Sequence, residues 1–166
     1  MWTQIIAALA VLTLGSPVIS AAQSSKSGDT YEWSAELVSI DSGNSTLTLK
    51  PRVAYPEAVS ELKQFKSGER VWVVWSGIHE YSDAIRQVRR AEAGNKITED
   101  LVLPAEFVSA EPPNAYVTIR IKAPANALAA VKGVKPSEWV TVTSRHRPST
   151  DAEAVVAVKP YAATTQ

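Results

Sequence analysis

The chain has 166 residues with 17 acidic and 17 basic side chains, so its formal net charge is zero. A balanced charge excludes the overall electrostatic attraction that brings strongly basic proteins to nucleic acids or anionic membranes, although a local patch can still exist. Hydrophobic residues make up 45% of the chain and charged residues 20%, as in ordinary globular proteins. This length fits one domain or two very small ones.

The N-terminal segment 1–22 has the features of a signal peptide. It contains no charged side chain, and an apolar run at 5–14 is broken by Gly-Ser-Pro at 15–17 before the small residues at 20–22. The run is too short for a permanent membrane span. We expect cleavage near Ala22 and a periplasmic or secreted mature protein; the alternative is an uncleaved N-terminal anchor. The chain has no cysteine, so a disulfide framework is excluded, which favours a bacterial exported protein.

The mature sequence contains two similar segments about 70 residues apart. Ala-Glu-Leu-Val-Ser at 35–39 returns as Ala-Glu-Phe-Val-Ser at 105–109. The apolar positions that follow recur at nearly the same spacing: Leu47 and Leu49 match Val117 and Ile119, Val59 and Leu62 match Leu128 and Val131, and Val71 and Val73 match Val140 and Val142. We therefore divide the chain into a signal peptide (1–22), a flexible lead (23–30), a β-rich repeat (31–91), a linker (92–100), a second β-rich repeat (101–161) and a tail (162–166).

The first repeat is predicted to form two strands, a short helix and two more strands, over residues 33–40, 46–53, 56–65, 70–75 and 84–90. The strands show alternating or β-branched apolar residues, and a polar Asp-Ser-Gly-Asn-Ser turn at 41–45 separates the first two. The helix is predicted from apolar residues spaced by three, with Pro56 at its start and Gly68 beyond its end.

The second repeat follows the same order after the charged linker. It begins near Leu101, and residues 117–122 alternate between apolar and polar side chains as a half-buried strand does. A helix is predicted over 124–132, capped by Gly133, and strands over 139–143 and 154–158.

The predicted fold class is mainly β. Two tandem duplicated β-β-helix-β-β units would form small OB-like barrels or one pseudo-twofold barrel. Each unit has only about 60 residues, which is marginal for an independent core, so we expect one compact body.

Three stretches carry a resemblance to known proteins: 36–41, 46–50 and 66–73. They resemble the small OB-like β-barrel modules of bacterial secreted and periplasmic proteins. That resemblance implies binding rather than catalysis. Some such barrels bind copper through His, Met and Trp, but the only methionine here is Met1, which argues against a soft Cu(I) site.

The two polar loops between the last strands of each repeat contain the only two histidines. His79 and Asp83 lie in the first loop, and His146 and Asp151 lie at similar places in the second. If the repeats pack symmetrically, these four side chains could form a divalent metal site. The alternative is a pair of solvated loops in which Ser/Thr-Asp pairs make turns, since arginines flank the second histidine and would repel a cation.

A candidate binding face is predicted on the last two strands of the first repeat, from Trp72, Trp75, Arg86, Arg89 and Arg90. Exposed tryptophan and arginine side chains contact anions, sugars and proteins well. The alternative is an edge strand that charge protects against self-pairing, with a core tryptophan beneath it. The simple alignment places only apolar residues of the second repeat, at 155, 157 and 158, opposite the three arginines.

No catalytic motif is present: the chain has no G-x-S-x-G turn, no Walker glycine loop, no H-E-x-x-H helix and no cysteine. We therefore expect a non-enzyme without a cofactor, acting as a secreted or periplasmic binding or envelope-associated accessory module. Its expected partner is an envelope protein or a glycan rather than nucleic acid. The alternative function is periplasmic metal binding through the His79 and His146 loops.

Overall fold

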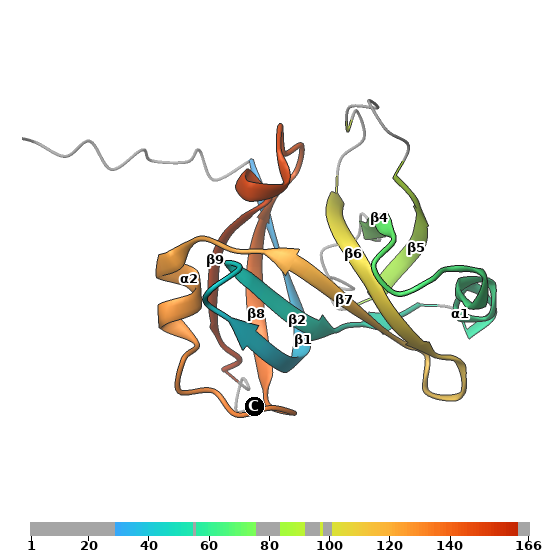
Figure 1. Ribbon diagram of the computed structural model, residues 1–166, viewed down its shortest axis with the longest axis horizontal. Helices are drawn as coiled ribbons and strands as arrows, with labels where there is room; N and C mark the ends of the chain where they lie inside the picture. The colour runs from blue at the N-terminus through green and yellow to red at the C-terminus, as the bar shows by residue number, and fades with distance from the viewer. Residues whose placement is uncertain (1–28, 55, 76–83, 92–96, 98–100, 163–166) are drawn as a thin grey trace, which may run out of the picture.

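The computed structural model describes residues 29–54, 56–75, 84–91, 97 and 101–162 (Figure 1). The protein is mainly β, as predicted, and its nine strands form one continuous sheet. The predicted signal peptide and the loop with His79 and Asp83 lie outside the described residues. Within the described part, no helix is long and apolar enough to cross a membrane.

The secondary structure follows the predicted order in both repeats. The first contains β1 (Thr30–Asp41), β2 (Thr46–Lys50), β3 (Arg52–Val53), α1 (Pro56–Glu61), η1 (Leu62–Gln64), β4 (Arg70–Trp75) and β5 (Ala84–Arg90). The second contains β6 (Val102–Glu111), η3 (Pro112–Asn114), β7 (Tyr116–Lys122), α2 (Ala125–Ala130), β8 (Trp139–Arg145), η4 (Asp151–Glu153) and β9 (Val155–Pro160). The second predicted strand is divided into β2 and β3, and Pro51 separates them.

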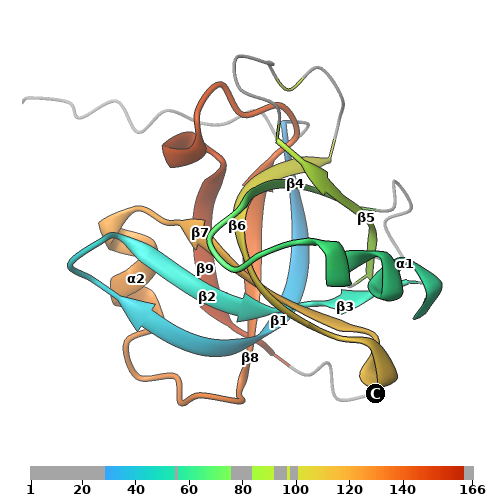
Figure 2. The same cartoon turned by 45° about the vertical axis from the view of Figure 1, so that its right-hand side comes forward.

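The sheet has two lobes. Its strand order is β3-β5-β4-β6-β7-β2-β1-β8-β9, and an additional pairing between β3 and β7 closes the first five strands into a barrel. We call these five strands the closed barrel, and α1 lies at one end of it, beside β3 and β5 (Figure 2). The second lobe consists of β1, β2, β8 and β9, with α2 packed against β9.

The strand registers of the two repeats correspond at a constant offset. In the first hairpin Glu36 pairs with Lys50, Leu37 with Leu49 and Ser39 with Thr48, and in the second Glu106 pairs with Arg120, Phe107 with Ile119 and Ser109 with Thr118. Every residue number differs by 70, and both hairpins carry an irregularity at the same place. The sequence similarity therefore has a counterpart in backbone hydrogen bonding.

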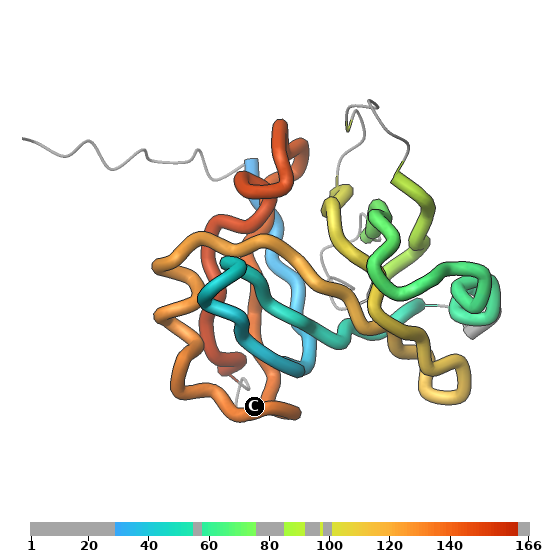
Figure 3. Tube along the Cα trace, in the orientation of Figure 1, coloured from blue at the N-terminus to red at the C-terminus, as the bar shows by residue number. Residues whose placement is uncertain are grey.

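Strands are exchanged between the repeats. β1 of the first repeat pairs with β8 of the second, and β6 of the second pairs with β4 of the first. Figure 3 shows the result as colour: the blue strand lies with red strands in one lobe, and green strands lie with a yellow strand in the other. Each lobe therefore contains strands from both repeats, and neither 31–91 nor 101–161 supplies a complete lobe.

The two lobes meet at the β2–β7 pairing. Leu49 lies opposite Ile119, and these two residues occupy equivalent positions in their repeats, so this pair marks the centre of the internal symmetry. Both side chains are fully buried. Phe65, directly after η1, and Phe107 of β6 also pack together, with ring centroids 5.6 Å apart.

Left-handed backbone conformations also recur at equivalent positions. Gly68 has φ of 90° and Ser137 has φ of 72°. Both residues donate a backbone hydrogen bond at 2.8 Å to the first strand of the other repeat, to the carbonyl oxygens of Phe107 and Leu37 respectively. A residue with a Cβ is strained at such a positive φ, whereas glycine is not. Ser137 is therefore strained where Gly68, at the equivalent position, is not.

We expect Ser137→Gly to raise the free energy of unfolding by about 0.5–1 kcal/mol, because relief of the left-handed strain exceeds the extra entropy of the unfolded chain. Urea denaturation would measure the change. The reciprocal control is Gly68→Ser, which should destabilise through the backbone alone, since no atom lies within 4 Å of a Cβ added there. Equal stability of all three proteins would contradict this interpretation.

The strand exchange predicts that the repeats cannot fold separately. A fragment ending at residue 91 loses β8 beside β1 and β6 beside β4, so both lobes would expose core residues. We expect fragments 23–91 and 101–166 to be unfolded alone and to assemble when mixed, as measured by circular dichroism and NMR amide dispersion. A cooperative thermal transition in either isolated fragment would contradict the prediction.

Candidate ligand-binding cleft

A cleft lies on the outer face of the sheet, where the closed barrel faces the segment between β8 and β9. It consists of two adjoining cavities of about 150 and 450 Å³. Arg70 of β4, Pro104 of β6 and Asp151 of η4 line both of them. The larger volume falls within the range of small-molecule sites, which is roughly 300–1,000 Å³.

The alternation of β4 decides which side chains reach this cleft. Val71, Val73 and Trp75 point into the core and are at most 2% exposed, whereas Trp72 and Val74 on the other face are half-buried. The strand therefore has one face in the core and one face toward the cleft. Trp72 lines the larger cavity.

Strand register brings two rows of side chains together on the outer face. Residues paired across neighbouring strands point to the same side of the sheet. One row consists of Arg89, Trp72 and Pro104, and the other consists of Arg70, Glu106 and Arg120. In the second row an acidic residue lies between two arginines, each directly opposite it.

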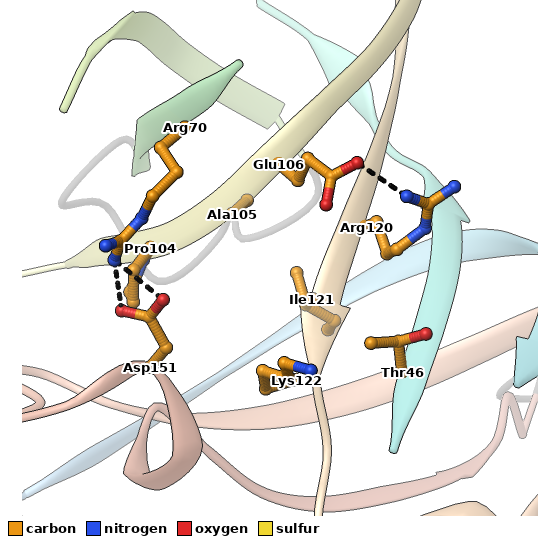
Figure 4. Close-up of a pocket in the computed structure, with 9 residues that line it drawn as sticks. All are labelled: Thr46, Arg70, Pro104, Ala105, Glu106, Arg120, Ile121, Lys122 and Asp151. Carbon is orange, nitrogen blue, oxygen red and sulfur yellow. Dashed lines mark hydrogen bonds and ion pairs between the residues drawn. The ribbon is translucent and has the colours of Figure 1, made fainter. Parts of the chain in front are cut away.

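The two arginines of that row form ion pairs with different carboxylates (Figure 4). Arg120 donates from Nη1 to Glu106 Oε1. Arg70 turns instead across the cleft, and its Nη2 donates to both oxygens of Asp151 at 2.7 Å. Nη1 and Nε of Arg70 have no hydrogen-bond partner within the described part of the chain. The Arg70–Asp151 ion pair thus bridges the lobes.

The cleft carries an excess of positive charge although the whole chain is neutral. Its described lining includes four cationic side chains, Arg70, Arg120, Lys122 and Arg147, and two anionic ones, Glu106 and Asp151. The balance of +2 is a local property that the overall composition hides. Such a lining favours an anionic ligand.

Two residues of the predicted binding face meet beside the cleft. Arg89 lies opposite Trp72 in the β4–β5 pairing, and its guanidinium carbon lies 5.2 Å from the centre of the Trp72 ring system. This is a cation–π contact, which holds the indole in place from the β5 side. The pairing therefore positions an aromatic side chain at the wall of the larger cavity.

The other residues of the predicted face lie elsewhere. Arg86 is exposed and does not line either cavity. Arg90 lies over the Phe65 ring at 5.5 Å and forms an ion pair with Glu69 at 3.6 Å. Trp75 is 2% exposed, so its side chain belongs to the core.

Trp75 belongs to a buried aromatic cluster between the lobes. Its ring stacks on Trp33 of β1, with centroids 4.5 Å apart and an interplanar angle of 29°. The indole of Trp33 donates from Nε1 to Ser144 Oγ at 2.9 Å, and both residues are fully buried. Burial raises the pKa of the neighbouring Tyr31 hydroxyl, so this phenol stays neutral.

We expect Ser144→Ala to lower the free energy of unfolding by about 1–3 kcal/mol, because the buried Trp33 N–H loses its acceptor. Denaturant unfolding would measure the loss. In a Trp33→Phe background the same substitution should cost much less, since no donor remains to be left unpaired. An equal cost in both backgrounds would show that the hydrogen bond contributes nothing.

Only half of the predicted metal ligands fall on described residues. The ring of His146 lies edge-on to Tyr31 with centroids 5.3 Å apart, and Asp151 is bound to Arg70. No group of three or more His, Cys, Asp or Glu side chains occurs in the part of the chain that the structure describes. His79 and Asp83 lie outside it, so the divalent metal site stays a prediction.

Sequence reasoning did not single out Arg70, Glu106 or Arg120. A usable signal existed, because Glu36 and Lys50 of the first hairpin recur as Glu106 and Arg120 of the second, a charge pair repeated at the same offset. The repeated charge pair could not be recognised from the sequence, because cross-strand partners are known only once the strand register is known.

The observed register corrects the comparison of the basic strand with the second repeat. Arg89 pairs with Trp72, and the equivalent pair in the second repeat is Lys159 with Thr141. One of the three arginines therefore has a cationic counterpart, which the simple alignment missed. What distinguishes the first repeat is the tryptophan beside that cation.

No protein-family model matches the chain, and comparisons with curated proteins and with solved structures give no match. The resemblance to OB-like modules of bacterial exported proteins accordingly stays a prediction.

Proposed function

We propose that this protein is a non-catalytic binding module that holds a small ligand in the cleft between its lobes. The observation that carries the proposal is the cavity of about 450 Å³ lined by Trp72, Arg70 and Arg147. An aromatic wall with a few converging charged groups is the usual composition of a ligand site.

Binding fits the chemistry of the lining better than catalysis does. A general base or a nucleophile needs a side chain that is available to take a proton or attack a substrate. In the described lining, Glu106 is paired with Arg120, and Asp151 is paired with Arg70 and marks that arginine as an anion-binding group. The arrangement supports recognition of charge by positioned groups.

The place of action that we propose is the periplasm or the exterior of a bacterium, with an envelope glycan or its components as the ligand source. The support comes from the apolar segment at 5–14 with the small residues at 20–22 and from the absence of cysteine. The neutral overall charge supports a glycan over nucleic acid, because nucleic-acid binding depends on electrostatic attraction to many phosphates. The cleft also offers fewer phosphate contacts than a polyanion needs.

We expect the mature protein, incubated with an extract of the envelope fraction of its source cells, to retain a small molecule that native mass spectrometry detects. Ser149→Trp should abolish this retention, because Ser149 lines the larger cavity and a bulky ring there would occupy it. Ala152→Trp is the matched control, since Ala152 is an exposed residue of the same segment that does not line the cleft.

Three outcomes can be separated in this experiment. Retention by the wild type and by Ala152→Trp but not by Ser149→Trp supports the proposal. Retention by all three proteins would place the ligand outside the cleft. No retained molecule in the wild type would argue against a small-ligand module.

A further inference from the structure

We infer that the ligand is a sugar anion, a uronate or a sugar phosphate, whose anionic group takes the place of the Asp151 carboxylate on Arg70. This inference rests on the proposed function and adds to it the chemical class of the ligand and the role of Asp151. It depends on the geometry of Arg70, on the composition of the larger cavity and on the charge of the cleft.

Arg70 already binds a carboxylate group within the cleft. Both contacts to Asp151 come from Nη2, while the other two nitrogens have no partner among the described residues. A guanidinium is a planar fork that binds carboxylate and phosphate groups through two nitrogens. A ligand that engages Nη1 or Nε together with Nη2 would therefore satisfy Arg70 better than Asp151 does.

The ion pair is also open enough to be exchanged. The Arg70 side chain is 65% exposed and that of Asp151 is 45% exposed. Water screens an exposed ion pair, so the pair contributes little free energy and an incoming anion can readily replace Asp151. Asp151 acts in this view as an internal competitor that occupies the anion site when no ligand is present.

The larger cavity has the mixed surface that a sugar requires. Trp72 and Pro104 provide an apolar wall, and the C–H face of a pyranose packs well on an indole. Ser149 and Thr150 line the same cavity from the segment between β8 and β9, and their hydroxyl groups can form hydrogen bonds with sugar hydroxyls. Arg70 lies between the two cavities, because it lines both.

The charge of the cleft agrees with one anionic group on the ligand rather than with a long polyanion. The described lining has an excess of +2, and displacement of Asp151 from Arg70 frees one guanidinium for the ligand. The remaining row pair, Arg120 with Glu106, is internally neutral. A single carboxylate or phosphate matches the guanidinium that this displacement releases.

Substitutions of the two partners of this ion pair are expected to change ligand affinity in opposite directions. Arg70→Gln removes the anion-binding group and should weaken binding by about tenfold. Asp151→Asn removes the competitor and should tighten binding by about threefold, as expected for an exposed ion pair. A merely structural bridge between the lobes would make both substitutions weaken binding.

The test uses the mature chain and three probes: D-glucuronate, glucose 6-phosphate and glucose. Dissociation constants are measured by ligand-observed NMR at low and at physiological ionic strength. We expect at least one of the two anions to bind about tenfold more tightly than glucose, because a charge-assisted hydrogen bond to Arg70 is added. A preference for glucuronate indicates a uronate as the ligand, and a preference for glucose 6-phosphate indicates a sugar phosphate.

A matched charge control separates local competition from general electrostatics. Glu153→Gln removes the same charge from the same short helix as Asp151→Asn, but Arg70 forms its ion pair with Asp151 and not with Glu153. We expect Glu153→Gln to leave the affinity unchanged. Equal tightening by both substitutions would overturn the competitor role, since only net charge would then matter.

The remaining outcomes distinguish this inference from the proposed function. Equal binding of glucose and the two anions, or binding of none of the three, would overturn the sugar-anion inference. The proposed function would still stand if the envelope-derived molecule is retained by the wild type and lost in Ser149→Trp. If the wild type also retains no envelope-derived molecule, both the sugar-anion inference and the proposed function are overturned.

Discussion

The structure depends on strand pairings that cross between the repeats, and the longest of these are β1 with β8 and β6 with β4. These ladders place strands of both repeats in each lobe, so the hydrophobic core forms only when the whole chain has assembled. Long-range pairing carries a large loop-closure cost before its hydrogen bonds and buried side chains stabilise it. The cost is offset by a core in which equivalent apolar residues of both repeats, such as Leu49 and Ile119, are fully buried.

The same exchange creates the cleft. Because β4 and β6 lie side by side, their outward residues Trp72 and Pro104 form one wall, and the segment after β8 lies across from it. That segment returns to the closed barrel through Asp151, which Arg70 holds. Two repeats that folded separately, one after the other, would not bring β4 and β6 next to the segment after β8, because these parts of the chain are far apart in sequence.

The matching strand registers also show where residues 31–91 and 101–161 differ. The register position of Trp75 in the first repeat is that of Ser144 in the second, and these residues now share the buried cluster around Trp33. On the outer face, Trp72 and Arg70 have the counterparts Thr141 and Trp139. Most core positions keep their apolar character, and Trp75 and Ser144 are an exception, whereas residues of the cleft differ between repeats, so the cleft is a property of one side of the molecule.

The sequence alone determined the mainly β class, the order of strands and helices and the buried alternation of Val117, Ile119 and Ile121, because hydrophobic periodicity is a local property of the chain. It also predicted a binding face of Trp72, Trp75, Arg86, Arg89 and Arg90, of which Trp72 lines the larger cavity and Arg89 lies over the Trp72 ring. Tertiary structure decided which strands pair across the repeats, why Trp75 is core while Trp72 lines a cavity, and that Arg70 meets Asp151, 81 positions away in sequence. The physical reason is that strand partners and ion-pair partners are chosen by the global arrangement of the sheet, and local patterns are compatible with several such arrangements.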